Sequence, residues 1–157
     1  MYFALFTLLL IIADQVTKYF TVSMLKPIGS VEIIKNILSF TYVENRGAAF
    51  GILQNARWVF IILTIIAIAA IIIYLLKEKP KDKTLIFSLS LILAGAIGNM
   101  IDRILKGFVV DMIEVTFINY PVFNFADCCV VIGAILLGIY ILFIYKEPQK
   151  EEKNDWT

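Results

Sequence analysis

Four long apolar runs alternate with shorter polar segments along the chain. They cover about residues 1–24, 58–76, 84–105 and 125–145. A helix needs about 20 apolar residues to cross the hydrocarbon core of a bilayer, so each run predicts a transmembrane helix. The first run is long, lacks a positively charged start and contains Asp14 and Lys18. We therefore interpret it as a retained span and not as a cleaved signal peptide.

The segments that follow the first and third spans have the composition of strands. Residues 31–35 are rich in β-branched side chains, residues 38–43 alternate, and residues 108–115 are also strand-like. We expect these parts of the segments 26–57 and 106–122 to form a small sheet on the outer ends of the helices. The predicted fold class is an all-α membrane protein, a single membrane domain of four transmembrane helices with a small extracytoplasmic β-sheet.

The lysine distribution predicts the orientation in the membrane. The loop 77–83 and the tail 146–157 together hold seven Lys or Arg residues, against five in the loops on the other side. Because cytoplasmic loops are enriched in positive charge, we expect both termini in the cytoplasm and the sheet outside. The tail is polar and charged, and we expect it to be flexible.

Composition narrows the chemistry that the chain can perform. With 61% hydrophobic and 17% charged residues it is neither an ordinary soluble domain nor a disordered chain. The net charge of +1 and the lack of a basic cluster argue against nucleic acid as a partner. The chain has no histidine, which excludes Ser-His-Asp triads, Cys-His pairs and His-ligated zinc. Cys128 and Cys129 are adjacent, so a disulfide between them is unfavourable and we interpret them as apolar filler.

Charged residues inside the spans are informative, because each costs about 2.5–3.5 kcal/mol at the bilayer centre. Asp14 and Lys18 stand four apart and share a helix face, either as a self-neutralising pair that fixes helix packing or as part of a site. Gly95, Asn99 and Arg103 form one stripe of the third span. The stripe is either a helix–helix seam with small residues or the support of a site.

Two further acids are predicted at the same outer level of the membrane. Asp111 follows an apolar pair in a strand, and Asp127 begins the fourth span. Asp111 could be a solvated strand-end carboxylate, and Asn124 with Asp127 could form a capping box. Alternatively, two carboxylates brought close together share a proton, and such a dyad activates water with one acid and protonates a leaving amine with the other. Peptide hydrolysis is thus available without histidine.

Five motifs taken together resemble the lipoprotein signal peptidases (signal peptidase II), a family of bacterial membrane aspartyl proteases. The motifs occur in the order and spacing of that family, and they are DQVTK at 14–18, NRGAAFG at 45–51, AGAIGNMIDR at 94–103, VVD at 109–111 and FNFAD at 123–127.

The resemblance implies a multi-pass enzyme of the bacterial cytoplasmic membrane whose sheet forms an extracytoplasmic β-cradle. It implies removal of the signal peptide from diacylglyceryl-modified prolipoproteins just before the lipidated cysteine, in contact with membrane lipid. It also implies inhibition by the cyclic peptide globomycin. No metal or organic cofactor is expected. We expect Phe50 to lie in a loop that covers the site.

The resemblance also implies roles for individual residues. Asp111 and Asp127 are expected to be the catalytic pair, and Asp14, Lys18 and Gly95 to have structural or positioning roles. The expected substrate-binding residues are Asn45, Gly47, Asn99, Arg103, Asn124 and Ala126.

Two other functions fit parts of the pattern. A transporter could use Asp14, Lys18, Asn99 and Arg103 as a polar path, but its acids should spread through the membrane depth in matching halves. A non-catalytic assembly protein could pair helices through its glycines, and it should tolerate loss of Asp111.

Overall fold

The computed structural model describes residues 2–47 and 53–145 of the protein. Within these residues, four helices are long and apolar enough to cross a membrane. They are α1 (Tyr2–Phe20) with its π-helical continuation η1 (Thr21–Leu25), α2 (Arg57–Glu78), α3 (Lys83–Leu105), and α4 (Phe125–Ile139) with its π-helical continuation η3 (Tyr140–Ile144). The predicted architecture of four membrane-length helices with a small β-sheet is confirmed. The expected lid around Phe50 and the tail 146–157 lie outside the described residues.

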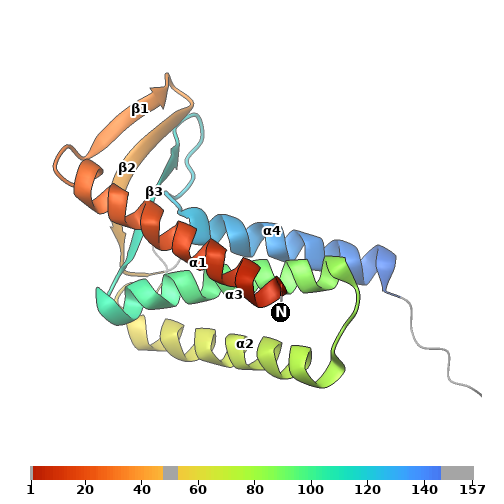
Figure 1. The fold of residues 1–157 in the computed structure, drawn as a ribbon. Helices are drawn as coiled ribbons and strands as arrows, with labels where there is room; N and C mark the ends of the chain where they lie inside the picture. Colours follow the sequence, from red (N-terminus) through yellow and green to blue (C-terminus); the bar gives the residue numbers. More distant parts are fainter. Residues whose placement is uncertain (1, 48–52, 146–157) are drawn as a thin grey trace, which may run out of the picture.

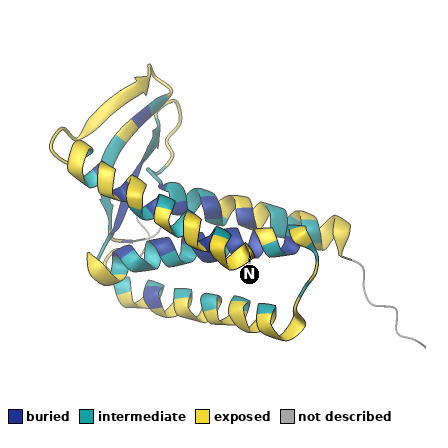
Figure 2. Ribbon diagram, in the orientation of Figure 1, coloured by how far each residue is buried: buried dark blue, intermediate teal, exposed yellow. Residues whose placement is uncertain are grey.

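Helix α3 is the centre of the bundle. It packs against α4, α1 and α2, and half of its most apolar window is buried, against 11% or less in the other three spans. Figure 2 shows this contrast, because exposed residues are frequent along α1, α2 and α4. Many of these exposed residues are large and apolar. Such surfaces are stable against lipid tails, which are as apolar as the side chains themselves. The start of α3 is fixed by Asp82, whose side chain accepts a hydrogen bond of 3.0 Å from the Leu85 N–H.

A three-stranded antiparallel sheet lies at one end of the bundle, at the C-terminal end of α3 (Figure 1). Its strands are β1 (Ser30–Ile34), β2 (Leu38–Asn45) and β3 (Val109–Val115), in the order β1-β2-β3. Strand β1 is exposed along its whole length, whereas the first four residues of β3 are buried. Strand β3 therefore joins the sheet to the helices.

Small residues allow α3 and α4 to approach closely. A Cβ atom added at Gly95 would meet the Ala126 carbonyl oxygen and would stand 2.6 Å from Val130 Cγ2. A Cβ atom added at Gly133 would stand 2.8 Å from the Ser88 carbonyl oxygen. No side chain larger than hydrogen fits at these separations, so the two glycines let α4 lie directly against α3 at two places along its length.

Candidate active site

Asp111 lies on the inner part of β3 and faces the end of β2. It pairs with Val43 across the sheet, so Asn45, two residues further along β2, is a diagonal neighbour on the same face. The Asn45 Nδ2 donates to Asp111 Oδ2 at 2.9 Å. Asp111 is only 1% exposed, so the interpretation of a solvated strand-end carboxylate is wrong.

Asp127 lies in the first turn of α4. Its backbone N–H donates to Asn124 Oδ1 at 2.9 Å, and its Oδ2 accepts from the Asn124 N–H at 3.1 Å, so the predicted capping box is present. Its other oxygen, Oδ1, accepts from Asn99 Nδ2 at 2.7 Å. The capping role uses one carboxylate edge and leaves Asp127 half-buried, facing a cavity. Asp127 can therefore cap α4 and still present its carboxylate to the cavity.

Asn124 joins the two acids. Its Nδ2 donates to Asp111 Oδ1 at 2.6 Å and to Asn99 Oδ1 at 3.1 Å, while its Oδ1 caps α4 at Asp127. Asn124 is fully buried, so these bonds do not compete with bulk water. One side chain thus fixes the position of Asp111 relative to Asp127.

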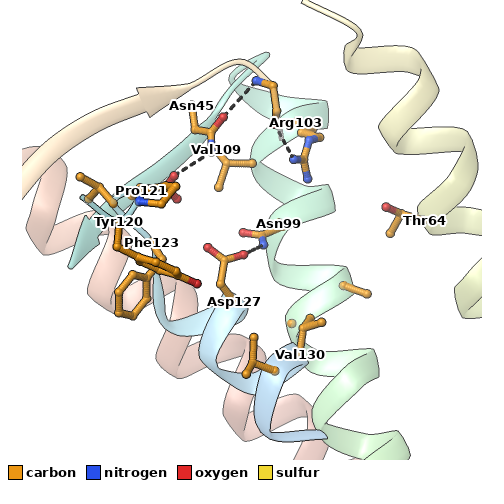
Figure 3. Close-up of a pocket in the computed structure, with 16 residues that line it drawn as sticks. Asn45, Thr64, Asn99, Arg103, Val109, Tyr120, Pro121, Phe123, Asp127 and Val130 are labelled. Carbon is orange, nitrogen blue, oxygen red and sulfur yellow. Dashed lines mark hydrogen bonds between the residues drawn. The ribbon is translucent and has the colours of Figure 1, made fainter. Parts of the chain in front are cut away.

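Both acids line a cavity of about 400 Å³ at the sheet end of the bundle, shown in Figure 3. Residues from β2, α2, α3, β3 and α4 contribute to it, and among them are Asn45, Gly47, Gly95, Asn99 and Arg103. Thr64 of α2 lies across the cavity from Asp127. The cavity therefore gathers five of the residues that the family resemblance implied around the two acids.

Arg103 is the cationic side chain of this cavity wall. Its Nη2 donates to the Gly47 carbonyl oxygen at 3.3 Å, and its guanidinium lies 4.8 Å from the centre of the Phe60 ring. Gly47 is also held from the other side, since its N–H donates to Asn45 Oδ1 at 3.0 Å. Arg103 and Asn45 together fix the chain just beyond β2 at the mouth of the site.

The environment of Asp111 favours its protonated form. Burial, followed by the negative charge of Asp127, raises the pKa of Asp111 to about 6, although the hydrogen bonds from Asn45 and Asn124 oppose the shift. A carboxyl group with such a pKa gains and loses its proton closer to neutral pH than an ordinary aspartic acid does. Perturbed acids of this kind are typical of catalytic sites.

A second group of charged residues lies deeper, between α1 and α3. Lys18 Nζ contacts Asp14 Oδ2 at 2.9 Å, Asp102 Oδ2 at 3.3 Å and Asn99 Oδ1 at 2.9 Å. Asp102 Oδ1 also accepts from Lys106 Nζ at 2.9 Å. The group holds two cations and two anions, so each buried charge has an opposite partner.

Asp14 also ties α1 to the start of α4. Its Oδ1 accepts from the Ala126 N–H at 3.0 Å, and Ala126 itself is fully buried. Gly98 leaves the space for this carboxylate, because a Cβ there would stand 2.5 Å from Asp14 Oδ2. In this structure Asp14, Gly98 and Ala126 form the helix contact behind the cavity.

Sequence reasoning missed some participants. Asp102 was not assigned to the site, although an acid three residues after Asn99 within an apolar span was a usable signal. The segment 120–122 and Thr64 line the cavity without any signal in the sequence pattern. Within residues 2–47 and 53–145, no cluster of three or more His, Cys, Asp or Glu side chains is placed to hold a metal ion.

Four membrane-length helices with a carboxylate pair in a cavity at one end define a multi-pass membrane protein with a site suited to hydrolysis. The chain belongs to the signal peptidase II family, since the family model described as "Signal peptidase (SPase) II" matches residues 6–143. This membership favours a peptidase over the transporter and the assembly protein.

Individual relatives agree with this assignment. A lipoprotein signal peptidase of Clostridium acetobutylicum is 42% identical over 146 residues, covering 91% of this chain and 94% of the relative. One from Caldanaerobacter subterraneus subsp. tengcongensis is 47% identical over 131 residues, covering 83% and 88%. A solved structure described as a bacterial membrane enzyme has a TM-score of 0.84 at 38% identity, covering 94% of this chain and 93% of its own.

Proposed function

We propose that the protein is an aspartic endopeptidase in which Asp111 and Asp127 are the catalytic residues. As a member of the signal peptidase II family it removes signal peptides from prolipoproteins. We propose that the substrate is diacylglyceryl-modified and is cut just before the lipidated cysteine. The observation that carries the catalytic type is the pair of carboxylates in one cavity, both held by Asn124.

The mechanism follows from the different surroundings of the two acids. Asp127 faces the cavity and acts as the base, taking a proton from a water molecule, whose oxygen attacks the scissile carbonyl carbon. Asp111 reacts in the protonated form that its burial favours and donates this proton to the carbonyl oxygen, so the product of this step is a neutral gem-diol. Its collapse breaks the C–N bond, Asp127 returns its proton to the leaving nitrogen, and Asp111 recovers a proton from a hydroxyl of the gem-diol.

The remaining predicted residues support this reaction. Asn45, Asn99 and Asn124 donate hydrogen bonds to the two carboxylates. In our proposal they keep the acids in register, and Arg103 and Gly47 align the substrate backbone at the mouth of the cavity. Ala126 contributes through the helix contact that it makes with Asp14.

The proposed setting is the bacterial cytoplasmic membrane. Residues 1–157 would form one membrane domain with both termini in the cytoplasm, so that the sheet and the cavity lie at the outer face, where water reaches the acids. Prolipoprotein and membrane lipid are the proposed partners, and nucleic acid is not. Globomycin is proposed to bind between Asp111 and Asp127. The distribution of lysines supports the orientation.

The test compares Asp111→Asn and Asp127→Asn with the wild-type enzyme on a diacylglyceryl-modified prolipoprotein, followed by gel shift and by mass spectrometry of the new N-terminus. Asp82→Asn is the matched control, because Asn caps a helix as well as Asp and residue 82 lies at the opposite end of α3. Both site variants should be inactive and the control fully active. A folded site variant that cleaves at near wild-type rate would refute the dyad.

A further inference from the structure

Lys18 is an unusual residue for a membrane helix, because its ammonium group is completely buried. An ammonium group has three N–H donors and no acceptor. In the structure it has three acceptors, namely Asp14 Oδ2, Asp102 Oδ2 and Asn99 Oδ1. Two of these partners are carboxylates that balance charge. The third is a neutral amide, which the charge balance does not require.

That amide is the one that holds Asp127. The Asn99 Oδ1 accepts from Lys18 at 2.9 Å and from Asn124 Nδ2 at 3.1 Å, while the Asn99 Nδ2 donates to Asp127 Oδ1 at 2.7 Å. If the amide were flipped, its NH₂ group would face two donors and its oxygen would face a carboxylate. All three hydrogen bonds would be lost, and the last would become a repulsion.

The Lys18 contact keeps one direction throughout the proposed reaction, because an ammonium group can only donate. A carboxylate at Asp127 can likewise only accept from Asn99, but Asp127 takes up a proton in the proposed cycle. The amide of Asn124 is oriented independently of Lys18, since its Oδ1 accepts from the Asp127 backbone N–H. Lys18 therefore keeps the oxygen of Asn99 turned away from Asp127 and the N–H group of Asn99 turned toward it.

We propose that Lys18 is a positioning residue for catalysis, which orients the Asn99 amide so that its N–H group faces Asp127. This inference rests on the proposed function of the two acids. It assigns to a buried lysine, outside the cavity wall, the alignment of the Asp127 carboxylate. Lys18 does not touch the reacting atoms and acts through Asn99.

The main experiment compares Lys18→Met with Lys106→Met on the diacylglyceryl-modified prolipoprotein. Both variants remove one cation from the same group and leave Asp102 with one ammonium partner, but only Lys18 contacts Asn99. Lys18→Met should lower kcat by about 10- to 100-fold, the usual effect of misplacing a catalytic group, and change KM by less than about twofold. Lys106→Met should change neither. Equal kcat values for the two variants would overturn the proposal.

A double-mutant cycle separates positioning from a purely structural role. In an Asn99→Ala background, Lys18→Met should cause no further loss of kcat, because the amide through which it acts is gone. If the loss of kcat in the double variant equals the product of the two single losses, the residues act independently and the proposal is contradicted. Asn99→Asp provides a test that leaves Lys18 in place. It keeps an acceptor for Lys18 but turns an oxygen toward Asp127, so its kcat should fall below that of Asn99→Ala, and an equal or higher kcat would refute the orientation.

Lys18→Met leaves the buried Asp14 without its ammonium partner and is expected to destabilise the protein, so a second variant is needed. The double variant Lys18→Met/Asp14→Asn restores the charge balance and should lose kcat relative to Asp14→Asn alone, by the same factor. Retention of the Asp14→Asn activity would refute the proposal. The dyad is tested independently, since inactive Asp111→Asn and Asp127→Asn variants with no effect at Lys18 would overturn only this inference.

Discussion

The sheet end of the bundle contains two pairs of acids in contrasting surroundings. Asp14 and Asp102, the interior pair, each contact the ammonium group of Lys18. Asp111 and Asp127, the cavity pair, receive hydrogen bonds from neutral amides, and within residues 2–47 and 53–145 neither makes an ion pair. Three of the four carboxylates are 1% exposed or less, so burial alone does not distinguish the pairs.

The partners of each pair decide what its acids can do. Asp14 and Asp102 both contact the same buried ammonium group, so their charges are balanced and their contacts hold α1 against α3. A carboxylate held by amides beside a second carboxylate can gain and lose a proton with little rearrangement. Aspartic acid therefore has a structural role in the interior pair and a proposed proton-transfer role in the cavity pair. The two pairs are connected by hydrogen bonds from Lys18 to Asn99 and from Asn99 to Asp127.

The sharpest test of this contrast applies the same isosteric change to both pairs. Asp127→Asn removes the proposed base and should lower kcat about 10³-fold or more, while unfolding should occur near the wild-type temperature. The measurements are cleavage of prolipoprotein and thermal unfolding in detergent, followed by a thiol-reactive dye that reaches the buried Cys129 as the bundle opens. An active Asp127→Asn enzyme would remove the distinction between the pairs.

Asp102→Asn should have the opposite profile. The change leaves Lys18 and Lys106 with one carboxylate fewer, and removing one partner of a buried ion pair typically costs about 3–5 kcal/mol. We expect a large drop in unfolding temperature in the same dye assay, with cleavage by the fraction that remains folded. Wild-type stability of Asp102→Asn would show that the interior pair is not structural.

The sequence predicts the spans and the strands, but it does not predict which acids contact an ammonium group and which contact neutral amides. Apolar length and alternation are local signals, so the helices and the sheet follow from composition and spacing. The pairing of Lys18 with Asn99 joins residues 81 positions apart, and it depends on how closely α1 approaches α3. The contact of Asp14 with the Ala126 N–H, 112 positions away, has no local signal either.

The raised pKa of Asp111 predicts how the stability of the protein depends on pH. The pKa of Asp111 is raised from 3.8 to about 6 in the folded protein, so the folded state binds this proton more tightly than the unfolded state does. The resulting contribution to stability is fully present below pH 4 and is lost as the pH rises through about 6.

Asp111→Asn has no such proton and should become more stable relative to wild type over this pH window, by at most about 3 kcal/mol at neutral pH. The measurement is the difference in unfolding free energy between the two proteins at several pH values. A difference that does not change between pH 4 and pH 7 would contradict the raised pKa.

The smallest predicted effect tests how tightly the interior pair is packed. At Gly98 an added methyl group would lie 2.5 Å from Asp14 Oδ2, so Gly98→Ala must displace the carboxylate that holds Lys18 and the Ala126 N–H. Overpacking of this kind costs about 1–3 kcal/mol. Gly138→Ala is the matched control, because nothing lies within 4 Å of the added Cβ in α4.

In an open helical position the alanine should stabilise the helix by about 0.5–1 kcal/mol, so the two glycine variants should shift the unfolding temperature in opposite directions. Gly98→Ala should also lower kcat, since a displaced Asp14 no longer holds the ammonium group that orients Asn99. If Gly98→Ala loses stability but keeps its full kcat, Lys18 stays in place without Asp14. The alignment of Asp127 would then depend on Asp102 as the remaining carboxylate partner of Lys18.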